Sequence, residues 1–246
     1  MVFGRIFCSQ LNVLEWRKEC DFELRNNLDV WRIFIPDFIG RITDEIHLVN
    51  DKELSKSDSF IQEEDKIRFL LGKIYLRKIL SSYLKIAPEE VVFSFTEFNK
   101  PYLDAYPNLN FNLSHSGDYV IIGLSNRWSV GVDIEVMNTK NDLFSMIYNT
   151  MSVVEVPSIL NSDTPRLMFY KHWTRKEALL KGVGIGLIDD LKGFSVCDGF
   201  NFVPSELSNF TSTLNVRNFI MDDEYSVSIA YDTTIRVIRF YEFNTV

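Results

Sequence analysis

The sequence has little cysteine: Cys8, Cys20 and Cys197 are its three cysteines in 246 residues. None of them stands in a CxxC or CxxH arrangement, so we expect neither a disulfide framework nor a zinc site of the usual ligand spacing. The N-terminal segment MVFGRIFCSQLNVLEWRKEC lacks the basic region and the long apolar run of a secretory signal. We therefore expect a protein of the reducing cytoplasm.

Long hydrophobic runs and an excess of positive charge are also missing. The longest apolar runs, such as Tyr119 to Leu124, suit a buried strand and fall short of the roughly 18 residues that a membrane span requires. Lys and Arg number 26 against 34 Asp and Glu, which gives a formal net charge of −8. Because nucleic-acid binding depends on neutralising phosphates, this balance argues against a nucleic acid as the main partner. A local cluster of Lys and Arg could still bind an anionic ligand.

Several common catalytic signatures are absent as well: GxSxG, the Walker A motif and HExxH. Gly182, Gly184 and Gly186 are spaced in a way that suggests dinucleotide binding, but they follow a predicted helix. The dinucleotide fingerprint must instead follow a strand and open a helix. We therefore interpret these glycines as a helix cap and a loop.

What the sequence does contain is the composition of a globular protein, with 46% hydrophobic and 24% charged residues. Apolar residues recur at helical spacing from Asp58 to Leu84, which predicts a long amphipathic helix. Thr164 and Pro165 predict the start of another helix that runs to about Lys181. A broken helical region is predicted over 143–160, and strands over parts of 1–50 and over 91–98, 110–114, 119–125, 129–136, 213–220, 225–231 and 235–241.

The order of these elements is strands, a long helix, strands, and then helices and strands again. This is a segregated α+β pattern that occurs twice, unlike the strict strand–helix alternation of α/β folds. The length allows one large domain or two of roughly 120 residues each. We therefore predict an α+β fold.

The segment Gly131-Val132-Asp133-Ile134-Glu135 is the first candidate site. Residues two apart on a strand point to the same face, so Asp133 and Glu135 project together while Val132 and Ile134 face the core. Two adjacent carboxylates repel each other unless a cation lies between them, and Mg²⁺ is commonly held by one or two carboxylates plus substrate phosphates. The alternative is an exposed strand face with two solvated acids.

The segment HWTRKEALLKG at 172–182 is the second candidate. On a helix Trp173, Glu177 and Lys181 lie along one stripe, at i, i+4 and i+8. They could supply a carboxylate for a metal or a proton transfer and an ammonium for a phosphate. The alternative is a tryptophan at the edge of the core beside one surface Glu–Lys pair.

The segment FNLSHSG at 111–117 is the third candidate. It reads as a strand that enters a tight turn, where hydroxyl and backbone donors could bind a phosphate. His115 is a weaker option for a catalytic base because no acid stands close to it in sequence. The alternative is the polar end of a hairpin.

Taken in order, these motifs resemble the 4′-phosphopantetheinyl transferase family. The matching segments are Asn-Lys-Pro at 99–101, FNLSHSG at 111–117, GVDIE at 131–135 and WTRKEALLKGVGIGL at 173–187. The resemblance is greatest to the long, single-chain type that serves nonribosomal peptide and polyketide synthases. Each motif alone is weak, whereas four in this order and spacing are specific.

The resemblance implies a pseudo-dimer of two similar α+β halves, residues 1–127 and 128–246, with the active site in the cleft between them. It implies a protein that works as a monomer, because one chain already holds both halves. It makes Asp133 and Glu135 the metal-binding pair and Glu177 the third acidic group, as a metal ligand or as the general base. Mg²⁺ would be the metal, and Lys181 would contact a phosphate of coenzyme A (CoA).

The resemblance also implies further CoA contacts. Lys100, Pro101, Ser114 and His115 would line the nucleotide end of CoA, and Lys56 would contact its 3′-phosphate. We include Lys176 among the CoA-binding residues, and with Arg175 and Lys192 in a basic patch for an acidic carrier protein. The loop after Gly184 and the strands beyond it would help to receive that carrier.

The activity implied is transfer of the 4′-phosphopantetheine arm of CoA to a serine of an acyl or peptidyl carrier protein, with release of 3′,5′-ADP. The carrier could belong to fatty acid, polyketide or peptide synthesis. The alternatives are a non-catalytic module that binds CoA or a carrier, and a Mg²⁺-dependent CoA pyrophosphohydrolase. Two positions depart from the family pattern: Glu155 is displaced from the usual place of a secondary acid, and Phe69 stands where a small hydroxyl residue is common.

Overall fold

The computed structural model of the protein describes residues 3–12, 14–126, 129–186, 190–204, 207 and 213–244. Before residue 127 it forms β1 (Phe3–Gln10), β2 (Trp16–Arg17), β3 (Asn27–Phe34), α1 (Ile42–Glu45), α2 (Asp51–Ser57), α3 (Glu63–Leu84), β4 (Ser94–Phe95), β5 (Pro101–Tyr102), β6 (Leu109–Ser116) and β7 (Tyr119–Asn126). After residue 128 it forms β8 (Val130–Val136), α4 (Leu143–Thr150), α5 (Glu155–Leu160), α6 (Pro165–Val183), β9 (Gly199–Pro204), β10 (Leu214–Met221), β11 (Tyr225–Asp232) and β12 (Val237–Glu242).

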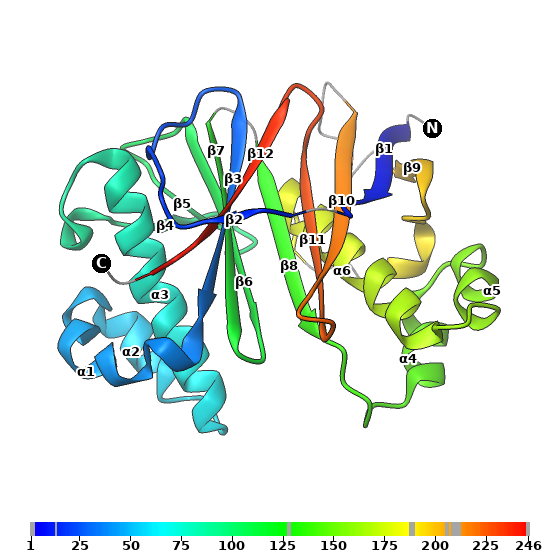
Figure 1. The fold of residues 1–246 in the computed structure, drawn as a ribbon, viewed down its shortest axis with the longest axis horizontal. Helices are drawn as coiled ribbons and strands as arrows, with labels where there is room; N and C mark the ends of the chain where they lie inside the picture. Colours follow the sequence, from blue (N-terminus) through cyan, green and yellow to red (C-terminus); the bar gives the residue numbers. More distant parts are fainter. Residues whose placement is uncertain are drawn as a thin grey trace.

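The strands form two five-stranded sheets and a small two-stranded one (Figure 1). The first large sheet has the order β2-β12-β3-β7-β6, and the second has the order β8-β11-β10-β1-β9. Both contain parallel and antiparallel pairs. The predicted α+β class is therefore confirmed, with two mixed sheets in two halves.

The two predicted halves exchange their terminal strands. β1 pairs in parallel with β10 and antiparallel with β9, so the start of the chain completes the second sheet. β12 pairs in parallel with β3 and β2, so the end of the chain completes the first sheet. Each sheet therefore needs residues from both ends of the sequence.

The long helix α3 covers the outer face of the first sheet. Leu70, Leu71 and Ile74 lie on its buried side, in one core cluster with Ile33 and Ile122 of the sheet. The helix ends at Leu84, and the capping residue Lys85 adopts φ 58° and donates its backbone N–H to Ser81 O. The predicted helix is thus confirmed from Glu63 onward, whereas its first predicted residues, 58–62, form a turn between α2 and α3.

Two other predicted elements are shorter or divided. Strand structure within 91–98 is limited to Ser94–Phe95, because the partner strand β5 is itself only two residues long. Val91 and Phe93 pack against the core, whereas Phe95 is exposed, so the alternation in the sequence matches burial only as far as Phe93. The helical region over 143–160 is divided into α4 and α5, and Pro157 lies in the first turn of α5, where a missing N–H is tolerated.

Helix α6 covers the second sheet and crosses β8 at a point of very close approach. A Cβ atom on Gly131 would lie 1.9 Å from Ala178 O and 2.3 Å from Gly182 N, so only glycine fits there. Gly184, with φ 81°, ends the helix and donates its N–H to Leu180 O. The close approach at Gly131 places the C-terminal half of α6 directly over the strand that carries Asp133 and Glu135.

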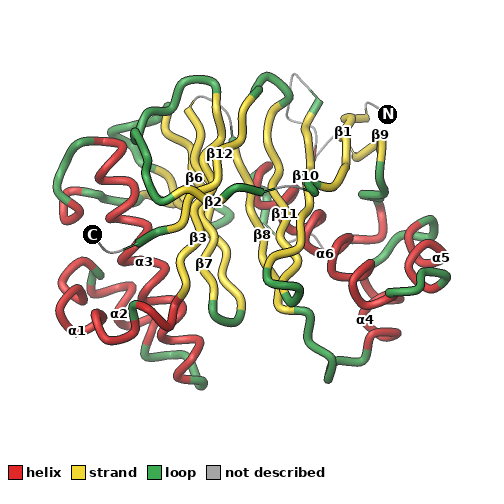
Figure 2. Tube along the Cα trace, viewed as in Figure 1, coloured by secondary structure: helices red, strands yellow, loops and turns green. Residues whose placement is uncertain are grey.

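Figure 2 shows that the strands occupy the middle of the molecule, with α1–α3 on one flank and α4–α6 on the other. A shared core lies between the two sheets, with Val30 and Ile121 from one and Phe219 and Val227 from the other. Among the described residues, no helix has both the length and the apolar character needed to cross a membrane.

Candidate active site

A cavity of about 300 Å³ lies where β6, β8 and α6 meet. β6 and β8 are the edge strands of different sheets and pack against each other. The lining residues of this cavity, here named the acidic cavity, are Leu113, Ser114, His115, Asp133, Glu135, Trp173, Glu177 and Lys181. The three candidate motifs, far apart in the sequence, thus contribute to a single site.

Local periodicity explains why these side chains share one cavity. Asp133 and Glu135 alternate along β8 with Val132 and Ile134, which are buried in the core between the sheets. On α6, Glu177 and Lys181 are one turn apart and face β8, because that helix packs on Gly131.

Asp133 is the most enclosed acid of the cavity. Its Oδ1 atom accepts hydrogen bonds from Lys181 Nζ at 2.6 Å and from Ser114 Oγ at 3.0 Å. Its Oδ2 atom is buried and has no hydrogen-bond partner among the described residues. Burial raises the pKa of Asp133, and the ammonium of Lys181 opposes that rise.

Glu135 and Glu177 hold protons more tightly than ordinary glutamates. Burial, helped by the negative charge of Asp133, raises the pKa of each to about 7. Glu135 Oε2 accepts a hydrogen bond from Ser116 Oγ at 3.0 Å. Glu177 Oε1 is buried without a hydrogen-bond partner in the described structure. The described lining of the cavity therefore has more carboxylates than positively charged groups.

This donor set fits a hard divalent cation. Carboxylate oxygens are the ligands that Mg²⁺ prefers, and Asp133 Oδ2 and Glu177 Oε1 are unpartnered atoms that could serve. Within the described part of the chain, no three His, Cys, Asp or Glu side chains are grouped closely enough to form a metal site by themselves. An ion here would take its remaining ligands from water or from phosphate oxygens, as Mg²⁺ commonly does.

Lys181, Ser114 and His115 form the basic and polar side of the acidic cavity. Lys181 Nζ donates to Ser114 Oγ at 2.9 Å as well as to Asp133. Burial lowers the pKa of His115 to about 4, so its imidazole is neutral at pH 7. A neutral imidazole offers one donor and one acceptor to a ligand.

Lys100 lies outside the acidic cavity, although the sequence suggested a CoA contact. Its Nζ donates to Lys181 O at 2.7 Å, Gly182 O at 3.0 Å and Ser129 Oγ at 3.0 Å. Burial lowers the pKa of Lys100 to about 8. The side chain therefore binds the C-terminal carbonyls of α6, where a cation also favours the helix dipole.

Lys176 is buried and does not lie on the surface where contact with CoA or a carrier protein was expected. Its side chain is fully buried, and its Nζ contacts Glu155 Oε2 at 2.8 Å and donates to Leu191 O and Phe194 O. Because i and i+1 point to different sides of a helix, Lys176 faces away from the side on which Glu177 lies. Glu155 is thus the partner of Lys176.

The expected basic patch for a carrier protein is also incomplete. Arg175 is fully buried and donates to Asp198 Oδ1 at 2.6 Å, so of Arg175, Lys176 and Lys192 only Lys192 is exposed. The loop predicted to receive the carrier continues after Gly186 into 187–189, which lies outside the described residues.

A second, larger cavity of about 840 Å³ contains the predicted contact Lys56 and also Pro101. We name it the lysine cavity, because Lys52 and Lys73 line it together with Lys56. The ring of Phe69 lies beneath two of these cations, with Lys56 Nζ 5.5 Å and Lys73 Nζ 5.4 Å from its centroid. Lys73 was not among the residues predicted to contact CoA, although its position four residues after Phe69 on a helix could have indicated a shared face.

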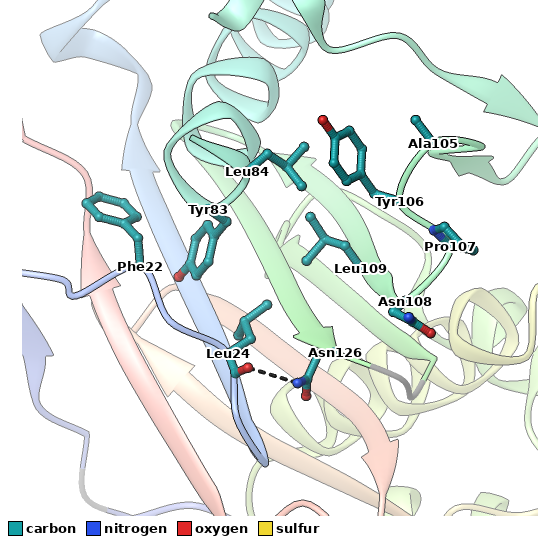
Figure 3. Close-up of a pocket in the computed structure, with 10 residues that line it drawn as sticks. All are labelled: Phe22, Leu24, Tyr83, Leu84, Ala105, Tyr106, Pro107, Asn108, Leu109 and Asn126. Carbon is teal, nitrogen blue, oxygen red and sulfur yellow. Dashed lines mark hydrogen bonds between the residues drawn. The ribbon is translucent and has the colours of Figure 1, made fainter. Parts of the chain in front are cut away.

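A third cavity, of about 360 Å³, has a different character. Figure 3 shows its lining, which is mostly aromatic and aliphatic: Phe22, Leu24, Tyr83, Leu84, Ala105, Tyr106, Pro107, Asn108, Leu109 and Asn126. None of these residues is an acid or a base at neutral pH. The described lining of this cavity therefore offers no charged side chain for phosphate or metal chemistry.

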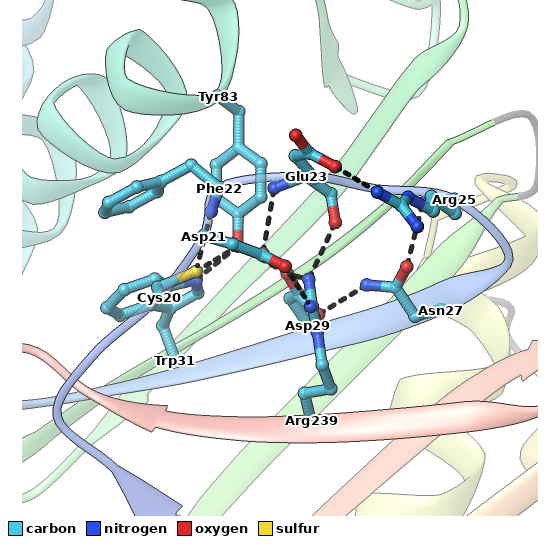
Figure 4. Close-up of polar contacts among 10 residues, drawn as sticks. All are labelled: Cys20, Asp21, Phe22, Glu23, Arg25, Asn27, Asp29, Trp31, Tyr83 and Arg239. Atoms are coloured by element: carbon cyan, nitrogen blue, oxygen red, sulfur yellow. Dashed lines mark hydrogen bonds and ion pairs between the residues drawn. The ribbon is translucent and has the colours of Figure 1, made fainter.

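A second cluster of charges lies beside that cavity and is structural (Figure 4). Arg239 of β12 binds the fully buried carboxylate of Asp29 on β3 through Nε and Nη2, both at 2.8 Å. Tyr83 donates its hydroxyl to the same carboxylate at 2.6 Å and accepts from Trp31 Nε1 at 3.0 Å. Arg239 and Asp29 neutralise each other, and their contact holds β12 against β3 of the first sheet.

Comparison with known proteins gives consistent results over both halves. Residues 40–126 match the model of the 4′-phosphopantetheinyl transferase N-terminal domain, and residues 129–230 match that of the 4′-phosphopantetheinyl transferase superfamily. The chain is 30% identical over 169 residues to 4′-phosphopantetheinyl transferase HetI of Nostoc sp., covering 67% of this chain and 71% of that protein.

Two further relatives come from a bacterium and a vertebrate. The chain is 30% identical over 186 residues to 4′-phosphopantetheinyl transferase Sfp of Bacillus subtilis, covering 74% of this chain and 81% of that protein. It is 31% identical over 152 residues to the L-aminoadipate-semialdehyde dehydrogenase-phosphopantetheinyl transferase of Xenopus laevis, covering 56% of this chain and 50% of that protein.

Proposed function

The chain belongs to the 4′-phosphopantetheinyl transferase superfamily, and we propose that it transfers the 4′-phosphopantetheine arm of CoA to a serine of an acyl or peptidyl carrier protein, with release of 3′,5′-ADP, in a Mg²⁺-dependent reaction. The observation that supports this proposal is the acidic cavity, where Asp133, Glu135 and Glu177 lie with Lys181 in one enclosed space. Carboxylates for a metal and an ammonium for a phosphate are the groups that phosphoryl transfer requires.

Asp133, Glu135 and Glu177 would hold the Mg²⁺. The bound ion would neutralise the pyrophosphate of CoA and the charge that develops on it during transfer. The unpartnered Asp133 Oδ2 and Glu177 Oε1 support this assignment, because a buried carboxylate oxygen without a partner is costly unless a ligand pairs with it.

Glu177 would act either as a ligand of this metal or as the general base that accepts the proton of the attacking serine hydroxyl. In the metal-free cavity its pKa is about 7, which is the range in which a general base works best. As the serine oxygen forms its bond to the phosphorus that bears the pantetheine arm, the bond to the bridging oxygen breaks and 3′,5′-ADP leaves with that electron pair. Lys181, held at the cavity by Asp133 and Ser114, would stabilise the negative charge of the leaving group.

The lysine cavity would receive the nucleotide end of CoA. Lys56 and Lys73 would contact the 3′-phosphate, and Pro101 would line the same space. Ser114 and His115 lie at the acidic cavity and would contact CoA there. The amino groups of Lys100 and Lys176 are engaged by backbone carbonyls and by Glu155, so we do not assign them to CoA.

Intact-protein mass spectrometry of an apo carrier domain tests this function. The carrier is incubated with the protein, CoA and Mg²⁺, with and without EDTA, and with the isosteric variant Glu177→Gln as a matched control. We expect one phosphopantetheine unit to be added to the carrier, only with Mg²⁺ and only with the unmodified chain.

Other outcomes identify the alternatives. No addition to carriers of fatty acid, polyketide and peptide synthesis, with CoA intact, would favour a non-catalytic module that binds CoA or a carrier. No addition with CoA cleaved would favour a CoA pyrophosphohydrolase.

A further inference from the structure

Three polar side chains of β6 join the two sheets at the acidic cavity. Asn112, Ser114 and Ser116 occupy alternate positions of this strand and face the edge strand β8. They accept hydrogen bonds from three backbone N–H groups of β8: Val132 N to Asn112 Oδ1 at 2.8 Å, Ile134 N to Ser114 Oγ at 3.4 Å and Val136 N to Ser116 Oγ at 3.1 Å. We name this row the polar ladder.

The polar ladder replaces the strand pairing that an edge strand lacks. The N–H groups of a sheet edge need partners, and here side chains supply them in place of a neighbouring backbone. Because the spacing of two residues is the same on both strands, the ladder fixes the register of β6 against β8. It therefore fixes the position of the strand that carries Asp133 and Glu135.

Two rungs of the ladder also contact the acids. Ser114 Oγ donates to Asp133 Oδ1 and Ser116 Oγ donates to Glu135 Oε2, both at 3.0 Å. A hydroxyl has one proton, so the bond that Ser116 accepts from Val136 N leaves its proton for Glu135. Ser114 lines the acidic cavity and contacts Lys181, whereas Ser116 is absent from the described lining. Ser116 thus contacts Glu135 from outside the cavity.

The turn that follows Ser116 is held from both halves of the molecule. Arg68 Nη1 of α3 donates to Gly117 O at 3.2 Å, and Asp118 N donates to Tyr225 Oη of β11 at 3.2 Å. Gly117 has φ 54°, and a Cβ atom there would lie 2.5 Å from the Tyr225 hydroxyl. These hydrogen bonds hold the backbone next to Ser116 in place.

We propose that Ser116 is a positioning residue, which holds the Glu135 carboxylate in the orientation that receives the divalent metal ion. This inference rests on the proposed function, since it concerns the metal of that reaction. Groups that orient metal ligands from outside the site commonly change metal affinity 10- to 100-fold when removed.

Mn²⁺ binding to the protein in the presence of CoA tests the proposal, measured from the loss of the free Mn²⁺ signal in electron paramagnetic resonance. We expect Ser116→Ala to raise the Kd for Mn²⁺ about 10- to 100-fold. We expect Ser116→Thr, which keeps a hydroxyl at the same place, to restore the Kd to within about 3-fold of the unmodified protein.

Asn112→Ala is the matched control, because Asn112 forms a rung of the same ladder without contacting a carboxylate. It should lower the thermal midpoint as Ser116→Ala does, yet leave the Kd for Mn²⁺ within about 3-fold. An unchanged Kd in Ser116→Ala, or an equal loss of affinity in Asn112→Ala, would overturn the proposal.

A crystal structure of Ser116→Ala provides a test that does not depend on the metal. A Glu135 side chain turned away from its position in the unmodified protein supports the proposal, and an unmoved side chain contradicts it. If the unmodified protein binds no Mn²⁺, the proposed metal-dependent function is contradicted. The comparison of the two crystal structures still decides whether Ser116 orients Glu135.

Discussion

At the scale of single residues, burial is what sets the acidity of the candidate site. Glu135 and Glu177 would be ordinary acids on an exposed strand or helix, but their enclosure and the charge of Asp133 bring the pKa of each to about 7. Only one ammonium, that of Lys181, lies among the described residues lining this cavity. The excess of negative groups favours either protons or a cation.

Removing one of these carboxylates should therefore abolish most activity. We expect Asp133→Ala or Glu177→Ala to lower turnover at least about 100-fold, more than is typical for groups that only orient a ligand. The measurement is the rate of phosphopantetheine addition to a carrier by mass spectrometry, with circular dichroism as the check on folding. Near-normal rates in both folded variants would contradict the assignment of the metal site.

His115 predicts a loss of stability in acid. Its pKa falls from 6.5 to about 4 on folding, so the unfolded chain binds more protons between these values. Stability from this residue is complete above pH 6.5 and is lost as the pH falls to 4. The free energy of unfolding should fall by about 1–3 kcal/mol between pH 7 and pH 5 because of this residue, and His115→Gln should remove that fall.

Urea unfolding at pH 7 and pH 5 without CoA measures this effect. His47 is the matched control, because its side chain is 58% exposed and contacts the exposed Glu89 and the backbone oxygen of Asp44. Because the side chain is exposed, His47→Gln should change the free energy of unfolding by less than about 0.5 kcal/mol. If the free energy of unfolding of His115→Gln varies with pH as it does in the unmodified chain, the prediction is contradicted.

At the scale of elements, helix α6 serves two purposes with adjacent residues. Glu177 and Lys181 face the acidic cavity, whereas Lys176 points into the C-terminal half and pairs with Glu155 at the start of α5. Glu155 also accepts backbone N–H bonds from Ser152 and Val196. One buried pair thus holds α5, α6 and the segment before β9 together.

Breaking that pair should reduce stability strongly. Lys176→Met leaves the Glu155 charge buried without its partner, which costs about 3–5 kcal/mol. Adding Glu155→Gln removes the charge but keeps an acceptor for Val196 N, so the double variant should recover part of the loss. Urea titration measures both, and the exposed Lys192→Met serves as the control that changes little.

The same variants separate the structural role of Lys176 from a ligand-binding role. CoA affinity measured by calorimetry on folded Lys176→Met should equal that of the unmodified chain, whereas Lys56→Ala should weaken it. A weaker CoA affinity in Lys176→Met at unchanged fold would restore Lys176 as a CoA contact.

At the scale of the whole molecule, the exchange of terminal strands ties the halves together. β1 lies within the sheet of the C-terminal half, and β12 lies within that of the N-terminal half. The Arg239–Asp29 pair and the polar ladder add polar links across the same boundary. The matched family models end and begin near residue 127, but neither includes β1 or β12. Monomeric behaviour in solution stays a prediction, to be measured by light scattering.

The exchange predicts that neither half folds alone. Residues 128–246 lack β1, so β10 loses a partner and the buried Ile6 and Cys8 are missing from the core under α6. We expect this fragment to show no cooperative unfolding in urea, and addition of residues 1–127 to restore a transition. Cooperative unfolding of 128–246 by itself would contradict this view and support two independent domains.

The sequence by itself determined the features that depend on local spacing. The helix from Pro165, the pairing of Asp133 with Glu135 on one strand face, and the stripe of Glu177 and Lys181 all follow from periods of 2 and 3.6 residues. The tertiary structure alone decided the partners of residues distant in sequence: Lys176 with Glu155, Lys100 with the end of α6, Ser116 with Glu135, and β1 with β10. These depend on which surfaces pack together, and a buried lysine and an exposed one have the same local pattern until that packing is known.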